Sequence, residues 1–294
     1  MKLISCILAT VSIFLATPAW SDEITEVRYM QPVSAQDKRQ HFVHEIIAAS
    51  LQATVATDGP YKMLPALEMN YDRAEIMQAK YPNLVARISG TKLREKKWLI
   101  IPIPINRGVV GYRIFLIKRS RQKEFANIFS LSDLISMGLR AGQNHRWSDV
   151  EILRENGIQV VTGTNYEGLF EMLMLNRFDF FPRGINEAFV ELADRQDKFQ
   201  DMKVEDTIAL YYPLPRVLAT SKGNYKLADR IERGLRTIFD NGVHRRIWIK
   251  HNKKWVAMAQ LHKRNIMTLS NSYALPNLPY DQKKFWFQPG EDLE

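Results

Sequence analysis

The sequence predicts an α/β protein whose mostly parallel sheets are covered by helices on both faces. Segments of strand length alternate with helical segments of about 10 to 15 residues along most of the chain, and this order is typical of buried parallel sheets. The 294 residues, 46% of them hydrophobic, are enough for a packed core in one large domain or in two smaller lobes.

The N-terminal segment predicts export. Lys2 gives a short positive region, residues 3–15 form an uncharged apolar run, and Ala19 and Ser21 are small residues at the positions that a signal peptidase reads. Cleavage is therefore expected before Asp22. The apolar run is shorter than the roughly 20 residues that cross a bilayer, so a cleaved signal peptide and a periplasmic protein are favoured over a retained membrane anchor.

Cysteine content and charge limit the possible chemistry. Cys6 is the single cysteine of the chain and lies in the segment that is expected to be removed, so the mature chain can form no disulfide. The formal net charge of +9, less the charge of Lys2, gives +8, which favours acidic partners such as a carboxylated ligand. Nucleic acid is not an expected partner, because the chain is exported and its basic residues are dispersed.

Periodicity defines the elements of the first half. Phe42, Ile46, Ala49 and Ala53 recur at helical spacing and predict a helix over residues 38–54. Other segments alternate between apolar and polar residues or form short apolar runs, which predicts strands. The expected strands cover residues 26–32, 61–69, 84–88, 98–105 and 109–117, and a second helix covers residues 71–80.

The second half repeats this alternation. Its clearest helix covers residues 226–240, where Leu227, Ile231 and Leu235 share a face and Gly242 follows the end. The remaining expected helices are a short one from Ser132 and those over residues 147–155, 166–175 and 185–194, and the expected strands cover residues 137–141, 158–161, 179–181, 207–212 and 216–220.

Residues 252–294 have a different composition, with three prolines and three adjacent aromatic residues at 285–287. Disorder is the simplest interpretation of a proline-rich tail. Adjacent exposed aromatic side chains are unfavourable, however. We therefore expect this tail to pack back on the body of the protein.

Three stretches carry a resemblance to a known family. Residues 89–96, Ser-Gly-Thr-Lys-Leu-Arg-Glu-Lys, resemble a Thr-x-x-Arg segment. Residues 130–143 contain Ser-Leu-Ser-Asp-Leu followed by Gly-Leu-Arg-Ala-Gly-Gln, and residues 218–224 read Leu-Ala-Thr-Ser-Lys-Gly-Asn before a helix. In this order they resemble the type II periplasmic solute-binding proteins, the extracellular solute-binding protein family 3 of polar amino-acid ABC transporters, over roughly residues 26–251.

The resemblance implies two lobes joined by two hinge strands, with a ligand cleft between the lobes. Lobe 1 would comprise residues 22–112 and 213–251, and lobe 2 residues 113–212. In this family the arginine at the position of Arg94, which follows Thr91, grips a ligand carboxylate through two parallel hydrogen bonds.

Lobe 2 would contribute its own contacts and departs from the family pattern. Gln143 and Asn144 lie on the loop that offers N–H groups to an anion. The family's aspartate for a ligand ammonium falls near Arg183, and Glu187 could substitute for it. If Arg183 faces the cleft, it and Arg94 would favour a dicarboxylate or another anion over a zwitterion. Arg183 could equally brace its own loop, and the sequence leaves both readings open.

Other candidate residues are weaker. His41 and His44 lie three residues apart on a predicted helix, but no further metal ligand is near them in sequence, so no metal is expected. Tyr29 and Trp147 are expected at the cleft edges, where rings stack on ligands, although either could belong to the core. With no mature cysteine and no Gly-x-Ser-x-Gly motif, no catalytic residue and no cofactor are expected.

The sequence thus predicts a monomeric periplasmic solute-binding protein that captures a small carboxylated or anionic, amino-acid-like ligand by hinge closure. Its expected partner is an inner-membrane permease. The alternative is a soluble ligand-sensing partner of a membrane receptor, and a dehydratase-like enzyme on the same fold is a minor one. The candidate ligand-binding residues are Arg94, Thr91, Gln143, Asn144, Arg183, Glu187, Tyr29 and Trp147.

Overall fold

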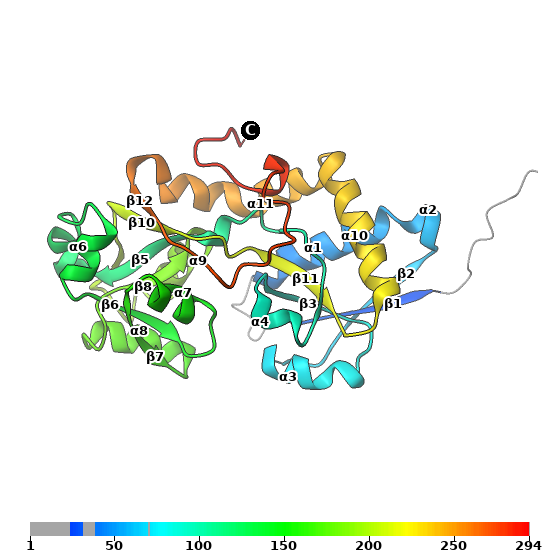
Figure 1. Cartoon of the computed structure of the whole chain (residues 1–294), viewed down its shortest axis with the longest axis horizontal. Helices are drawn as coiled ribbons and strands as arrows, with labels where there is room; N and C mark the ends of the chain where they lie inside the picture. The colour runs from blue at the N-terminus through cyan, green and yellow to red at the C-terminus, as the bar shows by residue number, and fades with distance from the viewer. Residues whose placement is uncertain (1–23, 32–38, 70, 294) are drawn as a thin grey trace, which may run out of the picture.

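Two lobes lie side by side along the long axis of the molecule (Figure 1). The computed structural model describes residues 24–31, 39–69 and 71–293. Within them the two-lobed α/β architecture predicted from the sequence is confirmed, whereas the predicted signal peptide, residues 1–21, lies outside the described residues. Among the helices of the described part, none combines the length and the apolar character that a membrane span requires.

Lobe 1 contains the elements before residue 105 and those from 216 to 240. They are β1 (Thr25–Tyr29), α1 (Arg39–Gln52), α2 (Val55–Asp58), β2 (Tyr61–Pro65), α3 (Tyr71–Ile76), η1 (Met77–Ala79), β3 (Leu84–Ser89), α4 (Lys92–Glu95), β4 (Leu99–Ile100), β11 (Arg216–Thr220) and α10 (Tyr225–Asp240). The strands form one sheet in the order β2-β1-β3-β11-β4. Helices α1 and α10 pack so closely that a Cβ at Gly234 would overlap the carbonyl group of Ser50.

Lobe 2 contains the elements between the two hinge connections and one strand from the C-terminal part. They are η2 (Val109–Gly111), β5 (Tyr112–Lys118), η3 (Arg119–Arg121), α5 (Gln122–Phe125), α6 (Leu131–Ser136), β6 (Arg140–Asn144), α7 (Asp149–Glu155), β7 (Gln159–Gly163), α8 (Tyr166–Met174), β8 (Phe181–Gly184), α9 (Ile185–Ala193), β9 (Met202–Val204), β10 (Ile208–Tyr211) and β12 (Asn265–Thr268). Strands β12-β10-β5-β8 form one sheet, with β9 beside β5, and β6-β7 form another.

The sheets are mixed, which differs from the mostly parallel sheets expected. In lobe 1, β1 is parallel to β2 and β3, but β11 is antiparallel to β3 and β4. In lobe 2, β5 is antiparallel to β8, β9 and β10. The antiparallel strands β5, β10 and β11 are those that follow or precede a passage between the lobes, so they enter their sheets from the opposite end to the strands of ordinary βαβ units.

Several predicted strands differ in extent from the observed ones, and prolines and a glycine explain two of these differences. Of residues 98–105 only Leu99–Ile100 is a strand, because Pro102 and Pro104 lack the N–H groups that a ladder needs. The strand expected over 137–141 is instead Arg140–Asn144. Gly138 has a positive φ of 66°, which only glycine adopts without strain, and so the turn after α6 continues beyond the predicted start of the strand.

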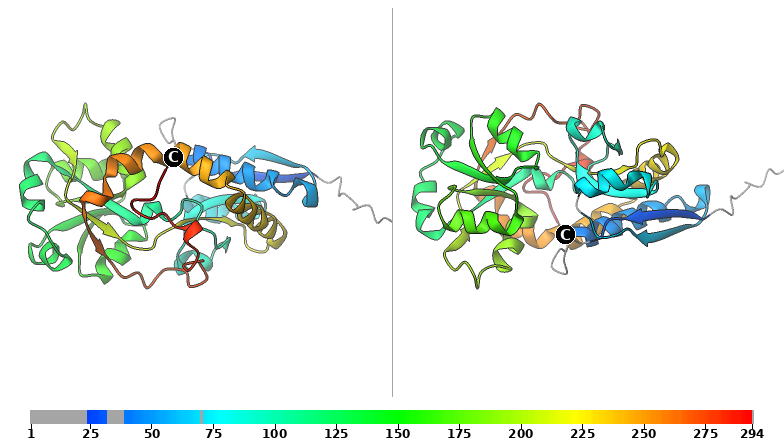
Figure 2. Two further views of the ribbon diagram at one scale, coloured as in Figure 1. Left: turned by 90° about the horizontal axis from the view of Figure 1, so that it is seen from above. Right: turned by 90° about the horizontal axis from the view of Figure 1, so that it is seen from below.

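Helix α11 (Val243–Ala259) runs across both lobes, as Figures 1 and 2 show from the side and from above. It packs against α1 and α10 of lobe 1 and against α9 of lobe 2. The expected start of the tail, residue 252, therefore falls inside a continuous helix. After η4 (Leu261–Lys263), β12 joins the lobe 2 sheet parallel to β10.

The chain then returns to lobe 1. Ser272 N donates a hydrogen bond to Glu155 of lobe 2 at 3.2 Å, and the next carbonyl, of Tyr273, accepts one from Lys92 N of lobe 1 at 2.9 Å. In this way α11 and the segment 269–274 add two passages between the lobes to the hinge connections at 105–112 and 211–216.

The C-terminal segment, residues 260–293, completes both cores. Leu275, Leu278, Phe285 and Trp286 belong to the buried cluster of lobe 1, around η5 (Lys283–Phe285). Phe287 is 3% exposed and packs against rings of lobe 2 and α11. Its aromatic triplet is thus buried rather than solvated.

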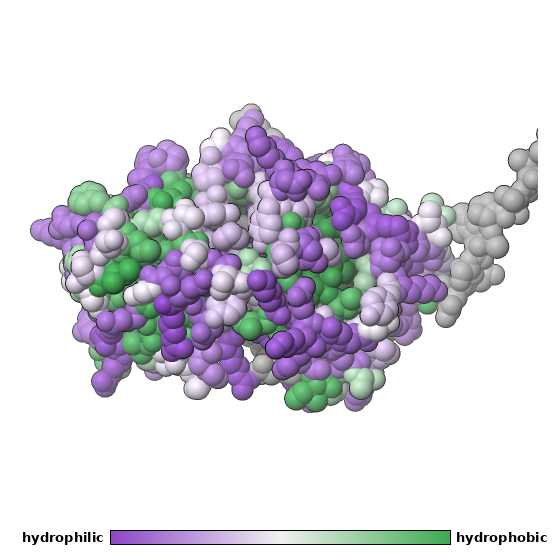
Figure 3. Space-filling view, viewed as in Figure 1, coloured by the Kyte–Doolittle hydropathy of each residue, from purple (hydrophilic) through white to green (hydrophobic). Residues whose placement is uncertain are grey.

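Hydrophilic residues cover most of the face shown in Figure 3, and apolar residues form separate groups, one of them over α3. Large exposed apolar side chains occur on both lobes, for example Ile76 at 79% and Phe129 at 73% exposure. A cavity lined by residues of both lobes lies between them.

Candidate functional site: an arginine-lined cavity between the lobes

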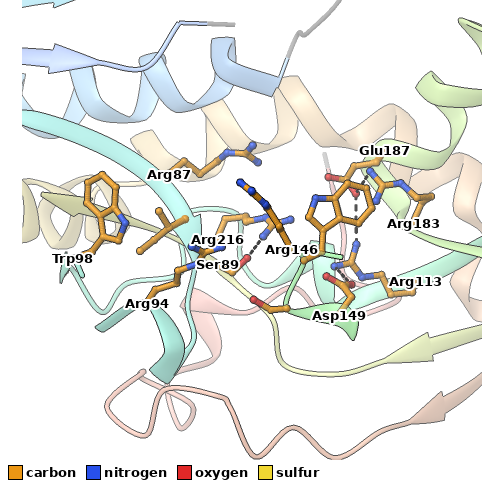
Figure 4. Close-up of a pocket in the computed structure, with 13 residues that line it drawn as sticks. Arg87, Ser89, Arg94, Trp98, Arg113, Arg146, Asp149, Arg183, Glu187 and Arg216 are labelled. Atoms are coloured by element: carbon orange, nitrogen blue, oxygen red, sulfur yellow. Dashed lines mark hydrogen bonds and ion pairs between the residues drawn. The ribbon is translucent and has the colours of Figure 1, made fainter. Parts of the chain in front are cut away.

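An open cavity lies where the two lobes face each other, with about 660 Å³ of empty space that includes open solvent, and residues of both lobes line it (Figure 4). Six of the thirteen lining residues are arginines, whereas only two, Asp149 and Glu187, are acidic. An interlobe crevice is the usual ligand position in folds of this kind. The six arginines are Arg87, Arg94 and Arg216 of lobe 1 and Arg113, Arg146 and Arg183 of lobe 2.

Strand pairing positions two of the lobe 1 arginines. Arg87 lies on β3, and Arg216, the first residue of β11, is the register partner of Ser89 on β3. The guanidinium of Arg216 donates a hydrogen bond to the Ser89 hydroxyl. Both side chains extend toward lobe 2 from the end of the sheet at which β3 ends and β11 begins (Figure 4).

The third lobe 1 arginine, Arg94, is held by an acid. Its Nη1 donates to Glu75 Oε1 at 2.7 Å, and Lys97 Nζ lies 2.7 Å from the other carboxylate oxygen. Burial opposes ionisation of Glu75, but the hydrogen bond from Lys97 and the charge of Arg94 outweigh it, so the pKa of Glu75 lies below its usual value. One carboxylate therefore faces two cations.

The lobe 2 arginines form a different arrangement. Arg113, on β5, is only 1% exposed, and its Nη2 lies 2.7 Å from Asp149. Its Nη1 lies 3.5 Å from Glu187, and its Nε donates to the Tyr212 hydroxyl at 3.1 Å. The same hydroxyl donates to Asp149 at 2.7 Å. Burial and the nearby carboxylate raise the pKa of Tyr212 well above its usual value, so it remains a donor.

Arg183 is the second buried arginine of lobe 2. Its Nε and Nη2 donate to the two carboxylate oxygens of Glu191 at 2.7 and 2.6 Å, and Nη2 also lies 3.2 Å from Glu187. The guanidinium stacks over the Trp147 ring at 4.5 Å. Burial alone would lower the pKa of Arg183, but the charges of Glu187 and Glu191 raise it well above its usual value.

Arg183 therefore combines the two roles that the sequence left open, facing the cleft and bracing its own lobe. It lines the cavity, yet its charge is taken up by Glu191 within lobe 2. Arg183 and Arg113 face Asp149, Glu187 and Glu191, so two buried cations are balanced by three carboxylates. Arg113 and Arg183 therefore add little net positive charge to the cavity.

Four of the eight residues predicted from the sequence come together at this cavity: Arg94, Trp147, Arg183 and Glu187. The other four lie outside its lining, each with local partners. Thr91 is fully buried and forms a β-bridge with Ala274. Gln143 is buried and donates to Pro182 O, Asn144 donates to Thr164 O, and Tyr29 packs on His44.

Sequence reasoning missed Arg87, Arg113, Arg146, Asp149 and Arg216. A signal was present for two of them, because Arg87 and Arg113 each interrupt a run of apolar residues on a predicted strand. A lone charge in a buried strand needs a partner or a function. Asp149 carries no such signal, because an acidic residue in the first turn of a helix is common.

Metal-binding groups do not gather at this site. Among the residues that the structure describes, no cluster of three or more histidine, cysteine, aspartate or glutamate side chains has the arrangement of a metal site. His44 instead hydrogen-bonds to Met30 O at 3.0 Å, and burial is the main cause that lowers its pKa.

Comparison with known proteins identifies the fold of this chain. No protein-family model and no curated protein matches the sequence. Solved structures do match: an ancestral arginine-binding protein bound to arginine is 17% identical, with 77% of this chain and 98% of that chain covered and a TM-score of 0.54. A periplasmic binding protein of Salmonella typhimurium with high arginine specificity is 14% identical, covering 77% and 99%, with a TM-score of 0.52.

A third structure is an ancestral amino acid-binding protein that is a precursor of cyclohexadienyl dehydratase. It is 14% identical, with 78% of this chain and 94% of that chain covered, and the TM-score is 0.51. At these identities the likeness concerns the fold. The chain therefore has the two-lobed fold of the periplasmic amino acid-binding proteins, as the resemblance in its sequence implied.

Proposed function

We propose that this protein is a periplasmic solute-binding protein that captures a small anionic, carboxylate-bearing ligand between its lobes. The observation that carries the proposal is that six arginines from both lobes converge on one cavity and outnumber the four carboxylates beside them, those of Asp149, Glu187, Glu191 and Glu75. Such a cavity attracts anions. A guanidinium also matches the planar geometry of a carboxylate.

Arg94 is the proposed anchor for the ligand carboxylate. Its side chain is 24% exposed and its Nη1 is engaged by Glu75. A guanidinium has five N–H donors, so the bond to Glu75 leaves donors for a ligand while it fixes the orientation of the group. Preorganisation of this kind lowers the entropic cost of binding.

The ligand class differs from that of the two similar structures named for arginine. Arginine carries a cationic side chain, and a cavity whose arginines outnumber the carboxylates beside them would repel it. We therefore propose an anionic ligand rather than a basic amino acid. Lobe 1 would bind it first, and hinge closure would follow because lobe 2 contacts the ligand only in the closed state.

Uptake completes the proposal. The predicted signal peptide would place the protein in the periplasm, and its partner would be an ABC-type permease of the inner membrane that recognises the closed form. The proposed role is binding rather than catalysis. Similar structures named as amino acid-binding proteins support this role.

A thermal-shift screen of the purified protein tests the function. Succinate and citrate should raise the midpoint of unfolding, whereas arginine and alanine should leave it unchanged. At a ligand concentration of about 100 times Kd the free energy of unfolding should rise by about 2.7 kcal/mol. Arg94→Ala should reduce the affinity for the same anion by at least about tenfold, because a charged hydrogen bond contributes about 1.5–3 kcal/mol.

Arg236→Ala is the matched control, because Arg236 lies on α10 with an exposed side chain and pairs with Glu232. It should bind the anion as the unmodified protein does. Stabilisation by arginine but not by anions would overturn the proposed ligand class, and undiminished binding by Arg94→Ala would overturn the anchor.

A further inference from the structure

The loop between β6 and α7 places an arginine at the meeting point of the lobes. Arg146 lines the interlobe cavity and also a second cavity of about 600 Å³ beside it, which Arg94, Trp147 and Ser148 share. Figure 4 shows the Arg146 side chain extending from lobe 2 into the space toward the lobe 1 arginines.

Hydrogen bonds behind Arg146 fix this loop. Arg146 N donates to Asn144 Oδ1 at 3.1 Å, and Asn144 Nδ2 donates to Thr164 O at 3.0 Å. The Nε of Arg146 donates to His145 Nε2 at 3.1 Å, and the other ring nitrogen of His145 lies 3.3 Å from Gly163 O. The backbone of Arg146 and the Nε of its guanidinium are therefore held within the loop, and the side chain lines the cavity.

Arg146 differs from the two buried arginines of the same lobe. Arg113 and Arg183 lie 1% and 4% exposed against Asp149, Glu187 and Glu191. Arg146 is an exposed loop residue. Its position on a loop at the lobe interface suits a group that meets a ligand during closure rather than one that holds the core together.

Charge limits what can fill the space between Arg146 and lobe 1. Among the described residues, the six lining arginines face two lining acids and two further acids beside them, Glu75 and Glu191, which leaves a formal excess of two positive charges. Closure brings Arg146 toward Arg94 and Arg216, and like charges oppose this approach. A ligand with two anionic groups reverses the sign of the interaction on both sides.

The lining acids are also unsuited to an ammonium group. Asp149 accepts a hydrogen bond from Tyr212 and forms an ion pair with Arg113, and Glu187 lies against Arg113 and Arg183. A ligand ammonium would have to compete with these buried cations for the same oxygens. Among the described residues that line this cavity, a zwitterionic ligand would therefore find a carboxylate site but no equivalent site for its amino group.

We propose that Arg146 is the lobe 2 contact for the ligand, and that the ligand is a small organic dianion without an ammonium group. One anionic group engages Arg94 and Arg216 of lobe 1, and the second engages Arg146. This inference rests on the proposed binding function and deepens it: Arg94 determines that an anion binds, and Arg146 determines that a second negative charge is required.

Isothermal titration calorimetry with three ligands of similar length tests this role. Glutarate has two carboxylates, butyrate has one, and glutamate adds an ammonium group to glutarate. The unmodified protein should bind glutarate at least about tenfold more tightly than butyrate or glutamate, as expected for one charge-assisted hydrogen-bonded pair. Arg146→Met should lower glutarate affinity to about that of butyrate and should leave butyrate affinity unchanged within about twofold.

Arg154→Met is the matched control, since Arg154 is an exposed arginine of the neighbouring helix α7 that pairs with Glu151. It should keep the full preference for glutarate. Arg146→Lys keeps the charge without the planar fork and should restore part of the preference. Thermal melts of all variants without ligand should coincide, because each changes an exposed side chain.

Each contrary result has its own meaning. If Arg146→Met retains the preference for glutarate, the role of Arg146 is overturned while anion binding stands. If glutamate binds more tightly than glutarate, the dianion class is overturned while an amino-acid ligand remains. If no anion binds the unmodified protein, the proposed function fails, and this inference fails with it.

Discussion

The two walls of the cavity use the same residue in opposite ways. Arg94 on the lobe 1 wall is 24% exposed and shares one carboxylate with Lys97. Arg113 and Arg183 on the lobe 2 wall are almost completely buried and are matched by three carboxylates, of Asp149, Glu187 and Glu191, that come from two helices. The number of arginines in a cavity therefore says little about its charge until their partners are counted.

Desolvation explains the difference. Removing a guanidinium from water costs several kcal/mol, which is recovered only if carboxylates satisfy its donors in good geometry. Arg183 meets this condition through two bonds to Glu191 and a stacked Trp147. Arg94, which keeps contact with solvent, needs less compensation. We therefore expect the two buried lobe 2 arginines, Arg113 and Arg183, to act mainly on stability and the lobe 1 arginines mainly on ligand affinity.

The largest effect should come from breaking the lobe 2 network. Arg183→Met removes the cation that Glu187 and Glu191 share and should lower the free energy of unfolding by about 3–5 kcal/mol, because it leaves buried carboxylates without a counterion. Arg94→Met on the opposite wall should lower it by no more than about 1 kcal/mol, since its pair is partly solvated. Urea denaturation of both variants makes this comparison directly. Equal losses in the two variants would remove the distinction between the walls.

A pH dependence of the free energy of unfolding should come from His244, which lies where α11 contacts the hinge. His244 on α11 donates through Nε2 to Ile105 O of the hinge at 2.6 Å and stacks on Phe239. Burial, with a smaller effect of the charge of Arg107, lowers the pKa of His244 from 6.5 to about 4. As pH falls below 6.5, His244 binds a proton in the unfolded chain but not in the folded chain. The free energy of unfolding therefore falls until about pH 4.

The expected loss is roughly 3 kcal/mol over this window, from about 1.4 kcal/mol for each unit of pKa. His244→Phe removes the titrating group and should flatten the stability curve by that amount between pH 6.5 and 4. The measurement is denaturant unfolding at a series of pH values. A curve whose slope is the same in both proteins would show that His244 does not titrate as described.

The smallest effect should come from Glu75, the acid that pairs with Arg94 on the lobe 1 wall. Glu75→Gln removes the negative charge beside Arg94 and Lys97, and it should tighten anion binding by about 1 kcal/mol, or about fivefold. Glu232→Gln on α10, whose carboxylate pairs with Arg236 on the surface, is the control and should leave affinity unchanged. Weaker binding in Glu75→Gln would mean that orienting Arg94 matters more than opposing its charge.

Local elements were largely predictable from the sequence, because their signals lie within a few residues. The helix expected over 226–240 is α10, Tyr225–Asp240, and the strand expected over 216–220 is β11 with the same limits. Short strands that depend on distant partners were not predictable. β12 has four residues and pairs with β10, and nothing within Asn265–Thr268 marks it as a strand.

The candidate site was predictable only in part. A motif identified Arg94, which lines the cavity, and Trp147, Arg183 and Glu187 lie there too. Whether an arginine is compensated depends on side chains from other elements, however. Arg113 on β5 meets Asp149 of α7 and Glu187 of α9, and such pairings follow from the assembled fold rather than from any local pattern.

The C-terminal segment also has a consequence for the order in which the protein folds. Lys92 Nζ donates a hydrogen bond to the carbonyl oxygen of Ser272, 180 residues later in the chain. In addition, β12 extends the lobe 2 sheet, and Phe285 belongs to the lobe 1 core. Neither lobe can complete its packing before the ribosome has made residues 265–287. Because contacts so distant in sequence slow folding, we expect the two lobes to acquire their final structure together, in one late step, rather than one after the other during synthesis.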